Sequence, residues 1–122
     1  MPKFKELDAN ATLLDQMNAQ DVPIVLIIIF TVSQDNEDAL LKAWAHDADF
    51  MKAHPGYIST QLHKGIAGSS TFINYAIWQD VESFRSAFTN PEFQRRIQDY
   101  PESAVASPHL FKKLTVRNHC VA

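Results

Sequence analysis

The sequence predicts an α+β fold in which helices cover an antiparallel sheet, in the order strand, helix, strand, strand, helix, strand. Three observations support this order. A β-branched apolar run occupies residues 24–30, two strand-like runs flank a loop that contains Gly65 and Gly68, and two amphipathic helical segments separate the strands. This order is that of the ferredoxin-like fold. The 122 residues are the length of one domain.

The chain is expected to begin with a helical arm over residues 1–21, followed by the folded domain over residues 22–122. Apolar residues of the arm recur at spacings of three and four, as on one face of a helix: Phe4, Leu7, Ala11 and Leu14. A partly frayed arm is the alternative interpretation, because chain ends are often poorly ordered.

The first strand of the domain is expected over residues 24–32. Asp35 or Asn36 can then cap a helix that continues to about Ala53. The His-Pro-Gly sequence at 54–56 ends this helix, because proline disfavours helical backbone in the residue before it and glycine permits the turn.

The second half of the domain is expected to hold a hairpin, two short helices and a last strand. Residues 57–63 and 71–78 form the hairpin strands. Helices occupy residues 80–88 and 91–99, and the second of them starts with an asparagine cap followed by proline. The last strand is expected over residues 109–116.

The first strand carries apolar residues on both faces. A sheet with helices on one face only should instead show polar residues at every second position. A second set of alternating residues is largely apolar too: Thr71, Ile73, Tyr75 and Ile77. Burial of this second face requires another layer. We expect a homodimer that packs sheet against sheet; an N-terminal arm that covers the face is the alternative.

Composition and charge restrict the partners and the location. The net charge of -3 argues against nucleic acid as the main partner, because phosphate binding requires concentrated basic charge. The apolar run at 24–30 is far shorter than the ~20 residues of a membrane helix, so no membrane association is expected. The single cysteine, Cys120, excludes an intrachain disulfide and favours a reducing compartment, and the expected location is cytoplasmic.

Cofactor and metal motifs are missing from the sequence. Its three glycines are scattered, so neither a dinucleotide-binding fingerprint nor a phosphate-binding loop can be written. His46 and Asp49 share a helix face but lack two further convergent ligands, and surface histidines are the simpler interpretation. No flavin, nicotinamide or metal cofactor is expected.

The strand at 71–78 holds the most informative run. Alternation places four of its residues on one face: Phe72, Asn74, Ala76 and Trp78. Asparagine is costly to bury without partners, and the Trp78 indole can only donate. If the hairpin register sets residue 61 opposite residue 74, then Ser59, Gln61 and His63 join this face and form a small-molecule cavity. Alternatively, Trp78 is a core residue and Asn74 caps a neighbouring backbone group.

The sequence resembles the antibiotic biosynthesis monooxygenase (ABM) family of dimeric α+β barrels over residues 22–116. The likeness is carried by Phe50-Met51-Lys52 leading into Pro55-Gly56-Tyr57-Ile58-Ser59-Thr60, and by Asn74-Tyr75-Ala76-Ile77-Trp78 followed by Phe84-Arg85. The resemblance implies the fold more specifically than an activity, because the family also contains haem-degrading relatives.

For family members that oxygenate aromatic polyketides, the resemblance implies a cofactor-independent monooxygenase. A phenol or hydroquinone is deprotonated, and its carbanion reacts with O2 in a dry cavity that supplies hydrogen bonds. The family's functional asparagine and tryptophan match Asn74 and Trp78, which are therefore expected to be catalytic, whereas its tyrosine falls at Phe84, which lacks the hydroxyl. His63 is the only candidate base by side-chain type. The candidate substrate-binding residues are Gln61, His63, Phe72, Phe84 and Phe88.

In the haem-degrading relatives, the matching tryptophan is again Trp78. Their strand asparagine falls near Ile29 and their haem-ligating histidine near Ile97. Both positions are apolar here, so haem degradation is disfavoured. Two hypotheses stand: a cofactor-independent monooxygenase that acts on a small aromatic compound, and a non-catalytic dimeric barrel that binds a small hydrophobic ligand or serves a stress response.

Overall fold

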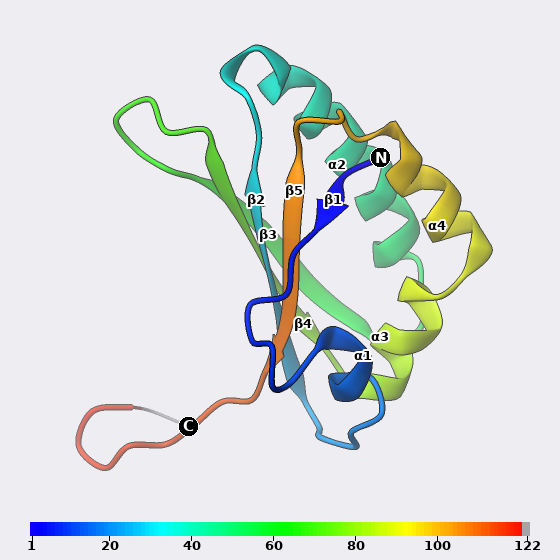
Figure 1. Ribbon diagram of the computed structural model, residues 1–122. Coiled ribbons are helices and arrows are strands. Elements are labelled where there is room, and N and C mark those ends of the chain that lie inside the picture. Colours follow the sequence, from blue (N-terminus) through cyan, green and yellow to red (C-terminus); the bar gives the residue numbers. More distant parts are fainter. Residues whose placement is uncertain (121–122) are drawn as a thin grey trace.

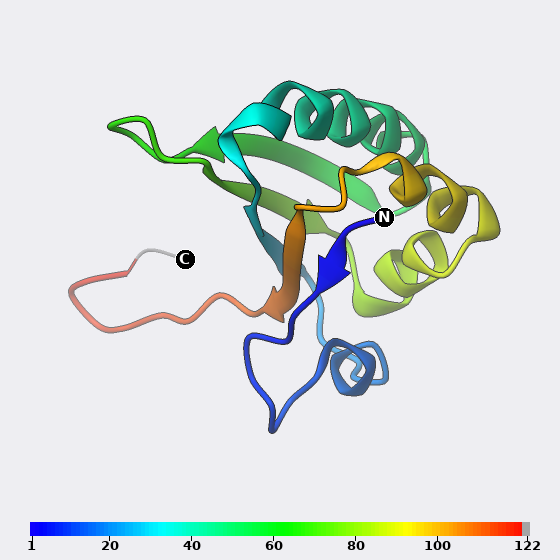
Figure 2. The same ribbon diagram turned by 45° about the horizontal axis from the view of Figure 1, so that its top comes forward.

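The computed structural model describes residues 1–120 and shows one five-stranded sheet (Figure 1). The strands are β1 (Lys3–Phe4), β2 (Ile24–Thr31), β3 (Tyr57–Lys64), β4 (Thr71–Trp78) and β5 (Val105–Phe111). The helices are α1 (Leu13–Gln16), α2 (Glu37–Lys52), α3 (Val81–Phe88) and α4 (Pro91–Arg96), with short 3-10 turns η1 (Gln34–Asn36) and η2 (Ile97–Asp99). Figures 1 and 2 both show α2, α3 and α4 over the same side of the sheet.

The strand order is β1-β5-β2-β4-β3. The four long strands pair antiparallel, and with α2 to α4 they confirm the predicted α+β, ferredoxin-like order of elements. The sheet as a whole is mixed rather than antiparallel, because β1 pairs parallel with β5.

The prediction of a helical arm is wrong for most of residues 1–21. Lys3 N donates a 2.9 Å hydrogen bond to the carbonyl of Ala104, just before β5, and Lys5 N donates one of the same length to Ala106 at the outer edge of β5. Only α1, capped by Thr12, is α-helical. The edge of β5 offers a row of unpaired backbone groups. Pairing with that edge satisfies the backbone of this segment, which a weak amphipathic pattern did not reveal.

The last strand is β5, not residues 109–116 as predicted. Pro108 lies in its middle, and a proline inside a run argues against a strand. The backbone groups of Ala106 and Leu110 bond to the N-terminal segment at the outer edge of β5. Alternate residues of a strand direct these groups to the same edge, so the missing N–H of Pro108 also faces outward and leaves the pairing with β2 intact.

A β-bulge between Tyr57 and Ser59 sets the register of the hairpin. Beyond the bulge, Leu62 of β3 lies opposite Asn74 of β4, so the register that would set residue 61 opposite residue 74 does not occur. After the bulge, the even-numbered residues Thr60 and Leu62 therefore share the helix-covered face with Asn74, and the odd-numbered Gln61 and His63 lie on the other face.

The sheet face away from the helices is apolar. Its residues on β2 and β4 include Val25, Ile27, Ile29, Ile73, Tyr75 and Ile77. Ile73 and Tyr75 are 39% and 42% exposed, so the N-terminal segment does not cover this part of the face. That a second copy of the chain covers this face, in a sheet-to-sheet homodimer, stays a prediction.

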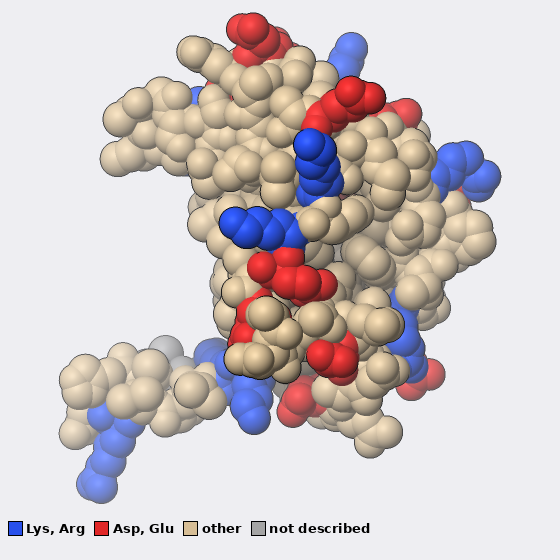
Figure 3. Space-filling model, viewed as in Figure 1, with Lys and Arg blue, Asp and Glu red and all other residues tan. Residues whose placement is uncertain are grey.

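No helix within residues 1–120 is long and apolar enough to cross a membrane. In Figure 3, acidic and basic side chains are interspersed over the body of the molecule, and the tail after β5 carries Lys and Arg. The viewed face of the body shows no continuous basic surface.

Candidate functional site

A cavity lies between the sheet and its covering helices. Its walls are mainly apolar, with aromatic side chains from the sheet and all three helices: Phe30, Trp44, Trp78, Phe84, Phe88 and Phe93. Few polar residues interrupt them: Asp47, Tyr57, Thr60, Asn74 and Tyr100. Apolar walls with a small number of polar groups are typical of a small-molecule site.

The volume of this cavity open to water is about 60 Å³, room for a few water molecules. A planar aromatic ligand therefore requires some of the surrounding side chains to move. Pro2 and Phe4 of the N-terminal segment belong to the wall, and the ring of Phe4 meets that of Phe88 edge-on at 6.4 Å between centroids. The N-terminal segment thus contributes to the closure of the cavity.

Asn74 lies on the sheet side of the cavity and is 7% exposed. The Thr60 hydroxyl donates a hydrogen bond to its Oδ1 at 2.5 Å. The partner is therefore a side chain on the neighbouring strand, not the backbone group expected if Asn74 served as a cap. No acceptor within residues 1–120 takes a hydrogen bond from Nδ2, so the amide N–H groups remain available for a ligand.

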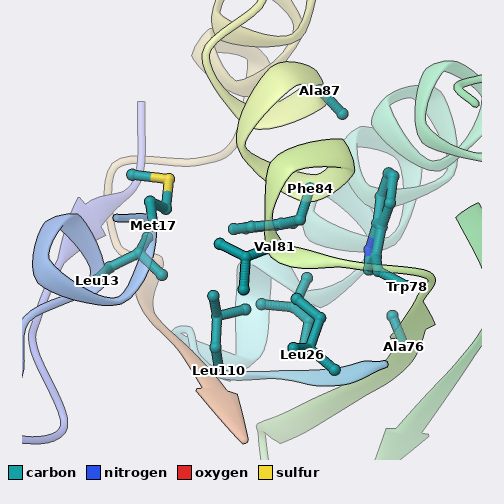
Figure 4. Packing of buried hydrophobic residues seen from close by; sticks show 10 residues of the cluster. Leu13, Met17, Leu26, Ala76, Trp78, Val81, Phe84, Ala87 and Leu110 are labelled. Atoms are coloured by element: carbon teal, nitrogen blue, oxygen red, sulfur yellow. The ribbon is translucent and has the colours of Figure 1, made fainter. Parts of the chain in front are cut away.

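Trp78 ends β4 on the same face and is 1% exposed. Its ring packs edge-on against Tyr57 at 5.7 Å and Phe84 at 5.8 Å between centroids. Figure 4 shows the indole beside Phe84 of α3, near Ala76 and Leu26 of the sheet. No side chain or carbonyl of the described residues accepts from the indole Nε1, so Trp78 is both a core residue and a second available donor at the cavity.

The aromatic residues predicted to bind substrate lie on the helix-covered side. Phe84 and Phe88 line the cavity, with their ring centroids 5.5 Å apart. Phe72 is buried in the adjoining core and is not part of the cavity wall. Phe84 carries no hydroxyl group and is fully buried against Trp78.

Gln61 and His63 lie on the opposite face of the sheet from Asn74, and both are exposed. The amide of Gln61 donates to the carbonyl of its neighbour Leu62 at 3.3 Å. The structure therefore does not bring these two predicted residues to the cavity, and His63 is not placed to act as a base there.

The histidine–aspartate pair considered as metal ligands separates into two surface ion pairs. His46 Nδ1 lies 3.5 Å from an oxygen of Asp99, and Asp49 lies 3.8 Å from Lys52 Nζ. Within residues 1–120, no three His, Cys, Asp or Glu side chains are grouped so that they could hold a metal ion.

Sequence reasoning missed four polar residues of the cavity, Asp47, Tyr57, Thr60 and Tyr100, and Asp47 is the one with a carboxyl group. It is 6% exposed, and the Tyr100 hydroxyl donates to its Oδ2 at 2.6 Å. Burial raises the pKa of Asp47 from 3.8 to about 7, although the Tyr100 hydrogen bond and the charge of Arg96 lower it. A signal was present: Asp47 follows Leu40 and Ala43 at helical spacing, which places a carboxyl group on the buried stripe of α2.

Comparison with known families identifies the domain. The antibiotic biosynthesis monooxygenase family matches residues 23–98, more than half of the chain and all of the cavity-lining strands except β1 and β5. The chain belongs to this family. No protein of curated function matches the sequence significantly.

Several solved structures are similar to this chain. SnoaB from Streptomyces nogalater, a cofactor-independent oxygenase, superposes with a TM-score of 0.72 at 20% identity, over 81% of this chain and 100% of that one. A suspected monooxygenase from Shewanella loihica PV-4 is 33% identical over the same shares, with a TM-score of 0.65. A suspected antibiotic biosynthesis monooxygenase from Bordetella bronchiseptica is 16% identical, with a TM-score of 0.66 over 78% of this chain and 100% of its own.

Proposed function

We propose that this protein is a cofactor-independent monooxygenase that oxidises a small aromatic phenol or hydroquinone with O2. The observation that carries the proposal is the pair of available donors, Asn74 Nδ2 and Trp78 Nε1, in an otherwise apolar and aromatic cavity. Such donors stabilise negative charge that develops on a substrate oxygen, and the low dielectric of the cavity strengthens the interaction.

The chemistry uses the electrons of the substrate. For an anthrone, deprotonation yields an electron-rich carbanion that reacts with O2 at the ring CH2 group. One oxygen atom becomes the new carbonyl oxygen and the other leaves as water, so that the four electrons that reduce O2 come from the substrate. The protein binds and orients the ring, excludes water, and donates hydrogen bonds to the oxygen that carries the charge.

Family membership and the resemblance to SnoaB, a cofactor-independent oxygenase, support this assignment. At 20% identity, the resemblance to SnoaB supports the fold and not a shared substrate. The retained Asn74 and Trp78 are what favour catalysis over mere ligand binding. Phe84 in place of the family's tyrosine favours a substrate other than that of the polyketide-oxidising members.

The same proposal includes a homodimer. The apolar sheet face leaves Ile73 and Tyr75 exposed on the side opposite the cavity. A second copy that packs its own sheet on this face would bury these side chains and leave the cavity of each subunit between its sheet and its helices.

The proposal is tested with 18O2. Purified protein is mixed with a panel of anthrones and hydroquinones, without added cofactor and with a chelator present. The product of an accepted anthrone should carry one 18O atom in its new carbonyl group, at a rate well above the reaction without protein. Tight binding of these compounds with no protein-dependent oxidation would instead favour the non-catalytic ligand-binding hypothesis.

A further inference from the structure

We propose that Asp47 is the proton acceptor of the cavity, the group that takes the proton whose loss converts a bound anthrone, phenol or hydroquinone into its anion. This assignment rests on the proposed function, because it supplies the base that the deprotonation step requires. It also replaces His63, which lies on the other face of the sheet. Among residues 1–120, no other Asp, Glu, His or Lys side chain lines the cavity.

The position of Asp47 is the first argument. It lies on α2 and reaches the cavity from the helix side, whereas Asn74 and Trp78 belong to β4 on the sheet side. Figure 2 shows α2 lying over the sheet, so the two sides are opposite walls. A flat substrate between these walls meets an acceptor on one side and two N–H donors on the other.

The hydrogen bonding of Asp47 is the second argument. Oδ2 accepts from the Tyr100 hydroxyl, and within residues 1–120 no donor is bonded to Oδ1. One oxygen is thus anchored while the other retains its capacity to accept a proton. The Tyr100 ring is itself held by a stack on Phe30, with 5.6 Å between centroids. Tyr100 therefore acts as a positioning residue for the carboxylate.

The charged surroundings are consistent with a base that works near neutral pH. Tyr100 and Arg96 stabilise the carboxylate, while burial opposes it. The other groups nearby are Tyr57 on the cavity wall, the His46–Asp99 pair at the surface, and the N-terminal amine, which bonds to the Tyr100 carbonyl at 3.0 Å. A base whose pKa lies near the working pH transfers protons most effectively.

The step itself is a simple proton transfer. For an anthrone, one C–H bond of the ring CH2 group breaks, its electron pair is delocalised onto the carbonyl oxygen, and a new O–H bond forms on the Asp47 carboxylate. For a phenol or hydroquinone, the bond that breaks is the O–H bond, and its electron pair stays on the substrate oxygen. The total charge of the cavity is unchanged. Negative charge moves toward the side of Asn74 and Trp78, where the two N–H groups can stabilise it.

The test separates this step from oxygen chemistry by excluding O2. The probe is 1,8-dihydroxyanthrone, whose anion and neutral form differ in visible absorption, added to the protein under anaerobic conditions at pH 8. The wild-type complex should contain the anion. Asp47→Asn keeps an oxygen that can accept from Tyr100, yet its complex should contain at least ~10-fold less anion, because the proton acceptor is missing.

Asp49→Asn is the matched control, since Asp49 lies on the same helix but pairs with Lys52 at the surface. It should behave as wild type. An equal fraction of anion in the wild type and in Asp47→Asn, or bound neutral probe in both, would overturn the assignment. Air is then admitted, which tests the proposed function separately. If the wild-type complex contains the anion but consumes no O2, the oxygenase function is wrong. If the wild type and Asp47→Asn consume O2 equally fast, only the role of Asp47 is wrong.

Tyr100→Phe provides a second variant in case Asp47→Asn does not fold. It keeps the carboxyl group and removes the donor that lowers the pKa of Asp47. The pH at which the bound probe ionises should therefore rise by about one unit, the size of losing one good hydrogen bond. An unchanged pH midpoint in this variant would contradict the role of both residues.

Discussion

The hydroxyl of Thr60 on β3 donates a hydrogen bond to Oδ1 of Asn74 on β4, 2.5 Å away across the hairpin. The two residues lie diagonally rather than opposite each other, because Asn74 faces Leu62. With Oδ1 engaged, the carboxamide is oriented and its NH2 group is the part left for a ligand. The bulge in β3 thus selects which β3 side chain assists Asn74.

Thr60→Val should reduce turnover by about tenfold while the fold is retained. Valine keeps the shape of threonine but leaves Oδ1 of a buried amide without its donor, which costs ~1–3 kcal/mol and frees the amide to rotate. The measurement is kcat and KM with an accepted anthrone, together with the thermal midpoint. Thr89→Val, whose hydroxyl bonds to the Arg85 carbonyl at the surface, serves as control. Equal activity of the two variants would count against the orienting role of Thr60.

The stability of the protein should fall as the pH rises from about 4 to about 7, because of Asp47. The folded state holds a proton on this carboxyl group up to a pKa of about 7, whereas an unfolded chain releases it near 3.8. Between these values the folded state binds more protons, so raising the pH favours unfolding; above pH 7 the penalty is constant. The burial of the ionised carboxylate thus lowers the free energy of unfolding by up to about 4 kcal/mol above pH 7.

Asp47→Asn removes this penalty. Urea unfolding at pH 4.5 and pH 8 should show that the variant gains stability over the wild type at the higher pH by a few kcal/mol. A difference between variant and wild type that does not change with pH would mean that Asp47 is not buried as a titrating carboxyl group.

The arrangement of the four long strands and of α2 to α4 could be predicted because it depends on local patterns. The β-branched run of β2, the start of α3 next to Asp80 and the Asn90-Pro91 start of α4 all appear in the structure. The limits of β2 agree with the prediction to one residue. Such signals act within a few residues and need no knowledge of the rest of the fold.

The candidate site was harder to predict because it depends on long-range geometry. Asn74 and Trp78 were placed on one face by strand alternation alone. Gln61 and His63 were placed on the wrong side because the bulge near Ser59 shifts the register by one residue, which exchanges the two faces. Asp47 required its partner Tyr100, 53 positions away in the sequence, to be recognised as part of a site.

Gln16 takes the place of a missing strand at the edge of β5. Its amide donates to Leu110 O and its Oε1 accepts from Leu110 N, both at 2.9 Å. Gln16→Ala should therefore lower the free energy of unfolding by ~1–3 kcal/mol, since two backbone groups lose their partner. Asn18→Ala, which removes an exposed bond to Leu14 O, should change it by less than ~0.5 kcal/mol. Equal effects in urea titrations would show that the edge contact contributes little.

Ile29→Lys should abolish the proposed homodimer. Ile29 lies on the uncovered sheet face, and a charge buried between two sheets without a partner costs several kcal/mol. Light scattering should give about twice the 13.8 kDa chain mass for the wild type and the mass of one chain, or aggregates, for the variant. Leu41→Lys on α2 is the control and should remain dimeric. A wild type with the mass of one chain would refute the dimer.

The most direct test of the central claim measures O2 consumption by the wild type, Asn74→Ala and Trp78→Phe with the same anthrone and no cofactor. Each variant should fold and lose turnover by ~10²-fold, the size expected for removal of one donor to a developing oxyanion. Trp78→Phe keeps most of the aromatic bulk, so its loss reports the missing Nε1–H. Variants that unfold at lower temperature but keep wild-type turnover per folded molecule would contradict the account and show that Asn74 and Trp78 are structural.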